Sequence, residues 1–406
     1  MKPAHEPERD RLLSVLVFLY VCSVLLFPEI PLLSRSSILL ACMIGFALLL
    51  RYHQREKLLL SRWMMLPFLF IIYALASILW AADPGSALIS MVSLLSGVGG
   101  AFVVWTALLA GASWHAVVRG CLWSGIIIIL STLPEMAEAK SNMRLAGILG
   151  NPNGMAIHLT TAAFLMMAAD KGKVGYGLAA TGFVLFATIF SGSIKMILFW
   201  AVFLFFAAVK LHVWSRASYL KKAAMMGIYL LLVAVPLFVG SYLYGHLEEM
   251  TVTQRFLDLL AGENTSSTTR LSMIEEALGL WVQHPLIGNG IDQFRVLGSY
   301  GTYSHNNYAE MLADFGLLGT TLFYVTDLVI VAFCLRGLFA DSRNLLVLLI
   351  TVISFLWDFG MVSYMEKSCW LLTAASFYLL YEAQGKQGWL SSGPVWGRIK
   401  AGGGTR

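Results

Sequence analysis

The chain has 406 residues, of which 58% are apolar and only 13% are charged, about half the charged share of a soluble domain. A folded soluble protein of this length cannot hide so much apolar surface from water, so a soluble enzyme, a disulfide-rich secreted scaffold and a disordered chain are excluded. Long unbroken apolar runs also exclude a transmembrane β-barrel, in which apolar and polar residues alternate. The composition predicts an all-α polytopic membrane protein, and the net charge of +5 is informative only through its distribution.

The apolar runs predict about 12 transmembrane helices. In chain order they lie near residues 12–27, 36–50, 63–80, 87–110, 115–133, 155–169, 174–190, 194–209, 223–244, 316–335, 344–363 and 367–383. Several runs are shorter than the about 20 residues that cross a bilayer core, so they need tilt or flanking residues. The first run leads to Glu29 and Arg35 without a small-residue cleavage site. We therefore expect it to be the first span and not a signal peptide.

Lys and Arg residues are divided unequally between the two sides that an even number of spans defines. Most lie on the side of the termini, and eight of the 28 lie in the opposite loops: Arg35, Lys140, Arg144, Lys195, Arg255, Arg270, Arg295 and Lys367. Because cytoplasmic loops carry the excess of positive charge, this bias predicts both termini in the cytoplasm. The eight exceptions run against the rule, which makes them candidates for a function on the outer side.

The predicted organisation has four parts. They are residues 1–244 with spans one to nine, an outer helical loop over 245–304, a segment over 305–383 that begins at His305 and holds spans ten to twelve, and a cytoplasmic tail over 384–406. Within the loop, residues 248–260 and 270–283 have helical spacing, and Ser266–Thr269 form a candidate N-cap cluster before the second helix. His284-Pro285 is expected to end that helix. We expect a small helical cap on the outer face of the membrane.

Residues 303–319, YSHNNYAEMLADFGLLG, close the outer loop and open span ten. His305 falls at the membrane boundary, where a neutral imidazole can take a proton from a hydroxyl group, since the ordinary pKa of His is about 6.5. An interfacial His beside a helix start explains the same residue without chemistry. No Walker A, GxGxxG, HExxH, DxD or zinc-ligand spacing occurs, which lowers the support for nucleotide-driven transport and for metal-dependent glycosyl transfer.

Cationic residues open three outer elements. Arg144 precedes Asn151-Pro152-Asn153, a turn in which the Asn residues are expected to cap the next helix. Arg270 opens the second cap helix, and Lys195 follows the turn Ser191–Ser193. Arg and Lys from separate elements can converge on one phosphate group, although snorkelling at the interface explains each of them alone. Arg255 and Arg295, in the same loop as Arg270, are further candidates.

Three stretches in this order resemble the bacterial O-antigen ligase and polymerase superfamily. They are GILGNPNG at 147–154, TRLSMIEEALGLWVQHPLIGNGIDQF at 269–294 and SHNNYAEMLADFGLLG at 304–319. Residues 80–84, WAADP, on the outer side of span three, are similar to a recurrent feature of the family. The resemblance extends from about residue 60 to about residue 380 and is strongest from Arg270 to Gly319.

The resemblance implies a multi-pass protein of the bacterial inner membrane whose active site faces the periplasm, which places the helical loop over 245–304 there. Such proteins move a glycan from undecaprenyl diphosphate to an acceptor and need neither metal nor nucleotide, so no cofactor is expected. His305 matches the residue taken as catalytic, and Arg270 matches a diphosphate contact. Many relatives carry an Arg directly after a turn like Ser191–Ser193, whereas Ile194-Lys195 follows here, so Lys195 takes that role only if the helix is offset by one residue.

The expected reaction is attack of an acceptor hydroxyl on the anomeric carbon of the donor, with inversion. Cations stabilise the departing diphosphate, and His305 activates the acceptor. The donor-binding candidates are Arg270, Arg144, Lys195, Arg255 and Arg295, and the supporting candidates are Asn151, Asn153, Asn306 and Glu310. The expected partners are the undecaprenyl-diphosphate-linked glycan, the lipid A-core acceptor and membrane lipids, with no nucleic acid.

The acceptor separates two alternatives within the family. A ligase transfers the glycan to lipid A-core, whereas a polymerase transfers it to another undecaprenyl-diphosphate-linked glycan. About 12 spans, one moderate outer loop and no large second loop favour a ligase. A transporter or flippase for an anionic lipid is a third alternative, which predicts broken helices in corresponding halves of the chain. The glycines and prolines here do not recur in that way.

Overall fold

The computed structural model of the chain describes residues 10–28, 30, 33–53, 62–138, 144–169, 174–193, 196, 199–200, 203, 265–338 and 341–390. Within these ranges every regular element is a helix and no strand occurs. The predicted all-α class is therefore confirmed for the described part of the chain.

The helices follow the predicted apolar runs. Before the first long gap they are α1 (Arg11–Leu26), α2 (Ser36–His53), α3 (Leu66–Ser77), α4 (Pro84–Leu109), α5 (Trp114–Ser131), α6 (Leu133–Glu138), α7 (Pro152–Met167) and α8 (Val174–Ser191). After it they are α12 (Thr265–Gln283), α13 (Gln293–Leu297), α14 (Asn307–Arg336), α15 (Ser342–Asp358) and α16 (Lys367–Leu390). The run near 223–244, most of the run near 194–209 and the expected helix over 248–260 lie outside the described residues.

Two helix boundaries differ from the prediction. Ser266–Thr269 lie inside α12 instead of capping it, because Ser and Thr cost only about half a kcal/mol each in a helix interior. α16 continues to Leu390, so the predicted tail from residue 384 begins inside a helix. The predicted end of α12 is confirmed, since the helix stops at Gln283, directly before His284-Pro285.

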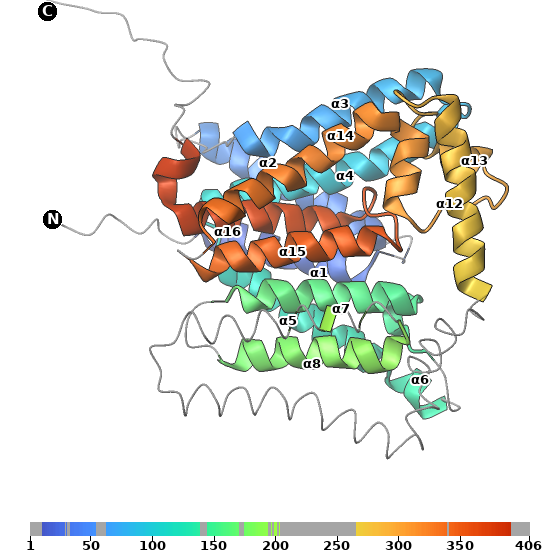
Figure 1. The fold of residues 1–406 in the computed structure, drawn as a ribbon. Coiled ribbons are helices and arrows are strands. Elements are labelled where there is room, and N and C mark those ends of the chain that lie inside the picture. The colour runs from blue at the N-terminus through green and yellow to red at the C-terminus, as the bar shows by residue number, and fades with distance from the viewer. Residues whose placement is uncertain are drawn as a thin grey trace, which may run out of the picture.

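The long helices lie side by side, and α12 stands across one end of them, at the right in Figure 1. We call this the cap end and the opposite one the far end. α4 packs on α16, α1 on α5, and α7 on α8. At the cap end, Lys367 at the start of α16 donates from Nζ to the carbonyl of Ser34 before α2, at 3.0 Å. Gln293 of α13 accepts from the Asp83 N–H before α4, at 2.8 Å.

The two ends of the described chain lie together at the far end. Asp10, directly before α1, pairs with Arg51 near the end of α2. Trp114 at the start of α5 stacks on Tyr378 of α16, with ring centroids 5.4 Å apart. The last part of α16 also reaches the far end of α14, where Gln384 donates to the carbonyl of Phe333 at 2.9 Å. This arrangement agrees with an even number of crossings, while the side of the membrane that each end faces stays a prediction.

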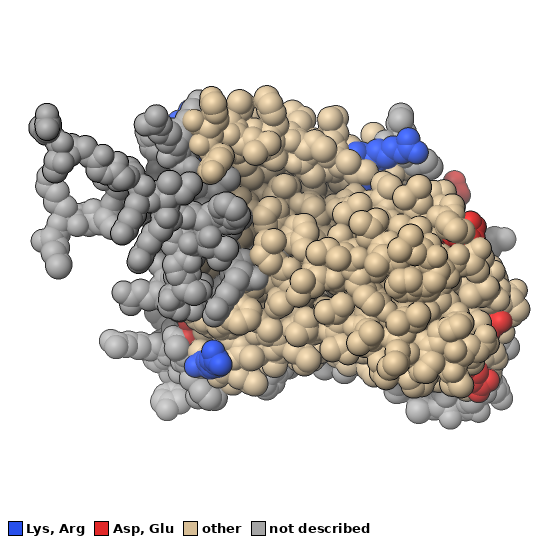
Figure 2. All heavy atoms as spheres, turned by 90° about the horizontal axis from the view of Figure 1, so that it is seen from above, with Lys and Arg blue, Asp and Glu red and all other residues tan. Residues whose placement is uncertain are grey.

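Among the described residues, four helical stretches are long and apolar enough to cross a membrane. They are Leu33–His53, Pro84–Leu109, Trp114–Glu138 and Asn307–Arg336, and shorter apolar helices span Arg11–Leu26, Leu66–Trp80 and Gly175–Ser191. The face in Figure 2 carries its charged side chains toward the two ends and uncharged residues between them. A belt of exposed Leu, Ile and Phe side chains on α2, α3 and α4 has the character of a lipid-facing surface. The chain thus has the build of a membrane protein, and the predicted number of spans remains a prediction.

Asp and Asn residues fix where helices begin at the cap end. Asp83 accepts from the N–H groups of the first turn of α4 at 3.0 and 3.2 Å, and Pro84 follows it. Asn151 and Pro152 begin α7 in the same way, as predicted, and Asn306 caps α14. Each such cap contributes about 1 kcal/mol. These residues therefore fix where α4, α7 and α14 begin at the cap end.

α14 is broken at Gly316, which has a φ of +60° and a ψ of −167°. Its backbone lies against the loop after α12, where Gly288 has a φ of +69°. A Cβ atom on Gly316 would lie 2.5 Å from the carbonyl oxygen of Leu286 and 2.6 Å from the N atom of Gly288. Glycine is therefore required at this approach for both its conformation and its small size. The break turns the first part of α14 toward α12, and this geometry positions the candidate site.

Candidate functional site

The turn that holds His305 has a rare backbone conformation. His305 has a φ of +59°, in the left-handed region that few residues other than Gly adopt, although His is among those that tolerate it. Its ring contacts the ring of Tyr303, with centroids 4.3 Å apart. The next residue, Asn306, caps α14 by accepting from the Ala309 N–H at 2.9 Å. Such conformations persist where the surroundings hold them, and they concentrate at functional sites.

Ser304 and Glu310 are the residues that hold this turn. Glu310 Oε2 accepts from the Ser304 N–H at 2.5 Å. The Ser304 hydroxyl donates to the Asn306 carbonyl at 2.9 Å and accepts from the Asn306 N–H at 3.2 Å. All three of these side chains are buried. Since the contacts lie on both sides of His305, they fix the direction in which its imidazole leaves the chain.

Glu310 belongs to a polar stripe on the first turns of α14. Asn307, Glu310 and Asp314 follow one another at helical spacing, and all three are buried. Asn307 Oδ1 accepts from the N–H groups of Ser363 and Tyr364 at 3.0 and 3.4 Å. The loop between α15 and α16 is thereby tied to the start of α14. A buried polar stripe is stable only when its groups are paired, and each of these three side chains has partners.

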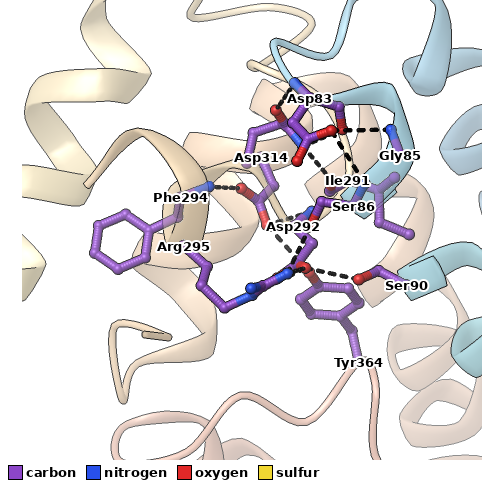
Figure 3. A network of polar contacts seen from close by, with 11 residues as sticks. Asp83, Gly85, Ser86, Ser90, Ile291, Asp292, Phe294, Arg295, Asp314 and Tyr364 are labelled. Atoms are coloured by element: carbon purple, nitrogen blue, oxygen red, sulfur yellow. Dashed lines mark hydrogen bonds and ion pairs between the residues drawn. The ribbon is translucent and has the colours of Figure 1, made fainter. Parts of the chain in front are cut away.

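Asp314 is the centre of the network in Figure 3. Its carboxylate accepts from the N–H groups of Phe294 at 2.7 Å and Asp292 at 3.1 Å, and from the hydroxyl of Tyr364 at 3.1 Å. Burial raises the pKa of Tyr364 well above its ordinary range, so the phenol stays protonated and donates. Asp314 therefore joins α13, α14 and the loop before α16 through a single side chain.

Arg295 connects α13 to α4. Its Nε and Nη2 donate to the Asp292 carboxylate at 2.5 to 3.2 Å, and Nη2 also donates to Ser86 Oγ at 2.6 Å. The Ser90 hydroxyl donates to Asp292 at 2.6 Å (Figure 3). The hydrogen bond to Asp292 raises the pKa of Arg295 above its ordinary range, so the guanidinium remains charged. These contacts hold α13 in place, which leaves Nη1 as the nitrogen for the predicted donor contact.

Arg144 lies in a second cluster at the cap end, between α6 and α7. It is half-buried, and it donates from Nε to the Ser191 carbonyl at 2.6 Å and from Nη2 to Asn153 Oδ1 at 3.0 Å. Asn151 accepts from the Asn153 N–H at 2.9 Å. The carboxylate of Glu135 accepts from the backbone that follows Arg144, at 2.8 and 2.9 Å. The structure thus brings Arg144, Asn151 and Asn153 together beside the turn Ser191–Ser193.

A series of contacts links this cluster to the His305 turn. Phe199, a few residues beyond the turn Ser191–Ser193, meets Trp357 of α15 with ring centroids 5.7 Å apart. The next residue of α15, Asp358, accepts from Asn307 Nδ2 at 3.3 Å. Asn307 follows His305 by two positions, so the two clusters share one end of the helix bundle.

Arg270 lies on the side of α12 that faces α14. Met273 and Ala277, three and seven residues later, are buried in a small apolar cluster with Ala309 and Ala313 of α14. Because residues three and seven apart share one face of a helix, Arg270 belongs to the same stripe. It is half-buried.

The level of Arg270 follows from the register of the two helices. The side-chain amide of Asn289 donates to the carbonyls of Leu280 at 3.3 Å and Ala313 at 2.8 Å, so these two residues are neighbours. α12 and the first part of α14 run in the same direction from this point (Figure 1). Arg270 precedes Leu280 by ten residues, about 15 Å, and His305 precedes Ala313 by eight. Both residues are therefore at the opposite end of this helix pair from Gly316.

Two of the predicted donor-binding residues, Lys195 and Arg255, lie outside the described residues. The sequence analysis also missed three members of the network, namely Asp292, Asp314 and Tyr364. The spacing Asn307, Glu310, Asp314 was the available signal, since it places three polar side chains on one face of a helix. Among the described residues, no group of three His, Cys, Asp or Glu side chains is placed to hold a metal ion.

The fold and the site define a class: a multi-pass helical membrane protein with His, Arg and buried carboxylates gathered at one end of its bundle. The family model described as O-antigen ligase matches residues 159–324. This stretch runs from α7 into α14 and includes Arg270, Arg295 and His305. The match covers less than half of the chain and supports membership of the O-antigen ligase superfamily, in agreement with the resemblance of 269–294 and 304–319 in the sequence. No match was found among curated proteins.

Proposed function

We propose that the protein is an O-antigen ligase, a glycosyltransferase that moves O-antigen glycan from undecaprenyl diphosphate to lipid A-core at the periplasmic face of the inner membrane. The observation that carries the proposal is the gathering of His305 and the cationic clusters at the cap end, inside or beside the stretch that matches the family model. Superfamily members are glycosyltransferase-like enzymes of the O-antigen ligase and polymerase kind, and lipid-linked glycan and lipid acceptor substrates follow from the family.

The donor is held by cations. When the bond from the anomeric carbon to the diphosphate breaks, negative charge grows on the phosphate oxygens. Arg270 and Arg144 stabilise this charge, together with Lys195, Arg255 and Arg295, and side-chain cations take the place of a divalent ion. Preplaced charges in a site with little water reduce a barrier by several kcal/mol. Asn151 and Asn153 support this part of the site, because Asn153 fixes the guanidinium of Arg144.

The acceptor is activated by His305. Its imidazole takes the proton of the sugar hydroxyl while the hydroxyl oxygen attacks the anomeric carbon from the side opposite the diphosphate, so the configuration is inverted. Undecaprenyl diphosphate leaves with the bonding electron pair. Glu310 and Asn306 act as positioning residues, since they hold the turn around His305. Two lipid substrates meet with their head groups at one membrane surface, which is catalysis by proximity.

The Arg270→Lys substitution tests how the donor is held. Lysine retains the charge but loses the planar pair of donors that suits phosphate oxygens. We expect the rate of glycan transfer to fall at least about tenfold, equivalent to about 1.4 kcal/mol, while the amount of protein in the membrane stays unchanged. Arg119→Lys, at an exposed position of α5, is the matched control and is expected to have no effect. Equal activity in the two variants contradicts bidentate binding of the diphosphate by Arg270.

A strain that lacks the protein distinguishes a ligase from a polymerase. Without a ligase, full-length glycan accumulates on undecaprenyl diphosphate and lipid A-core remains bare. Without a polymerase, lipid A-core carries single repeat units. We expect the first pattern, measured by gel separation of lipopolysaccharide and mass spectrometry of the lipid-linked glycan. The second pattern identifies a polymerase.

A further inference from the structure

One corner of the cap end exposes a group of large apolar side chains. Leu286 and Ile287, in the loop after α12, are 60% and 41% exposed, and Leu317 and Leu318, after the break in α14, are 46% and 51% exposed. The Leu317 and Leu318 N–H groups donate to the carbonyls of Pro285 and Leu286 at 2.9 and 3.1 Å, so the four side chains stand on adjoining backbone. We call these four residues the apolar corner.

The backbone of this region is irregular, yet many of its polar groups are paired within the protein. The Asn289 and Gly290 N–H groups donate to the carbonyls of Ala313 and Asp314 at 3.0 and 2.7 Å. The Tyr73 hydroxyl lies at donor distance from the carbonyls of Ile287, 2.9 Å, and Phe315, 3.1 Å. Together with the two bonds of the apolar corner, these contacts give a donor to most of the carbonyls from 285 to 287 and from 313 to 315, with the one proton of the Tyr73 hydroxyl shared between two of them. Pairing of this kind lowers the cost of irregular backbone at the depth of a membrane.

The length of α14 gives the depth of the apolar corner. From Leu317 to Arg336 the helix has 20 residues, which span about 30 Å. That is the thickness of a typical hydrocarbon core. With Arg336 at the boundary on the far side, where a charged head reaches the interface, Leu317 lies at the boundary on the cap side.

The lipid-facing surface of α3 leads directly to the apolar corner. Leu69, Ile72 and Leu75 of α3 form an exposed apolar row with Leu79 of the short helix Ile78–Trp80 that follows, and Leu79 is 88% exposed. The apolar stretch from Leu66 to Trp80 has only 15 residues, about 22 Å, which is shorter than the hydrocarbon core. The Tyr73 hydroxyl joins the middle of α3 to the apolar corner, so the corner adjoins this exposed row from the side.

We propose that the apolar corner is inserted into the hydrocarbon of the membrane leaflet on the cap side and anchors α12 to the bilayer. The occupant is lipid, because the exposed side chains adjoin the lipid-facing row of α3 and most carbonyls of the backbone beneath them are paired within the protein. Burial of four large apolar side chains in hydrocarbon then fixes the height of α12 above the membrane. The proposal depends on the helices crossing the membrane and does not depend on glycan transfer.

A photocrosslinking amino acid tests the proposal on the full chain. Leu286→benzoylphenylalanine, in protein reconstituted into vesicles of phosphatidylethanolamine and phosphatidylglycerol, is expected to form covalent adducts with lipid acyl chains on illumination. The matched control is Leu271→benzoylphenylalanine. Leu271 is 57% exposed, close to Leu286, but it lies on the face of α12 opposite Met273 and Ala277, which pack toward α14. Lipid adducts at residue 286 are expected to exceed those at residue 271 several times.

Leu318→benzoylphenylalanine provides a second position in the apolar corner, with the same expected result should the Leu286 variant fail to accumulate. Equal lipid adducts at the corner and the control position overturn the proposal. Adducts between two copies of the chain also overturn it, since they identify a second copy as the occupant. Absence of any adduct at both corner positions places the apolar corner in water and has the same consequence. The crosslinking measurement does not require transfer activity. Failure of the proposed function therefore does not change its outcome.

Discussion

Replacement of His305 with Ala is expected to lower the rate of glycan transfer about 10²- to 10⁴-fold. This is the usual contribution of a positioned general base. The protein is expected to accumulate in the membrane, because His305 lies in a turn and its side chain is only half-buried. The measurement is the rate of transfer by equal amounts of purified protein.

The matched control is His284→Ala, since His284 is an exposed His directly after α12. Its activity is expected to stay normal. His305→Gly separates the two properties of the residue, because Gly adopts a φ of +59° without strain but supplies no base. Activity near normal in either His305 variant removes the role as base.

Replacement of Asp314 with Ala is expected to produce the largest loss of stability among the site residues. The substitution leaves the N–H groups of Asp292 and Phe294 and the hydroxyl of Tyr364 without their acceptor in a buried place. A buried donor without a partner costs about 1 to 3 kcal/mol, so the combined cost is about 3 kcal/mol or more. Asp314→Asn retains one carbonyl oxygen as acceptor and is expected to fall between the native protein and the Ala variant.

Thermal unfolding in detergent measures this series, and Glu275→Ala is its control, because Glu275 is an exposed acid on α12. We expect the midpoint to fall in the order native, Asn, Ala, with no change in the control. If the Ala variant unfolds at the native temperature, Asp314 does not hold α13, α14 and the loop before α16 together.

Much of the helical arrangement could be predicted, because hydropathy is a local property. The apolar runs located the helices, and the Asn-Pro pair at 151–152 gave the start of α7. The prediction that Arg144 lies near this turn was also accessible, since Asn153 follows it by only nine residues. The end of α12 directly before His284-Pro285 could be predicted because Pro restricts the backbone of the residue that precedes it.

The network around Asp314 could not be predicted in this way. Asp292 and Asp314 are 22 residues apart in the chain, and they meet because α14 breaks at Gly316 and its freed backbone pairs with the loop after α12. Gly316 in the sequence indicates flexibility, but only its neighbours in space show why it is needed. The partners of Arg295 could not be predicted for the same reason. The sequence suggests an anion contact for this residue, whereas in the structure its Nε donates to Asp292 and its Nη2 to Ser86.

The most direct test of the central claim is transfer between two purified lipids. The protein, reconstituted in vesicles with an undecaprenyl-diphosphate-linked O-antigen glycan and lipid A-core, is incubated with a chelator and without nucleotide, and products are separated by mass spectrometry. The account predicts lipid A-core that carries the glycan, one undecaprenyl diphosphate released per glycan, and loss of both products with His305→Ala. Glycan transfer that is unaffected by His305→Ala, or its absence with native protein that supports O-antigen attachment in cells, would contradict it.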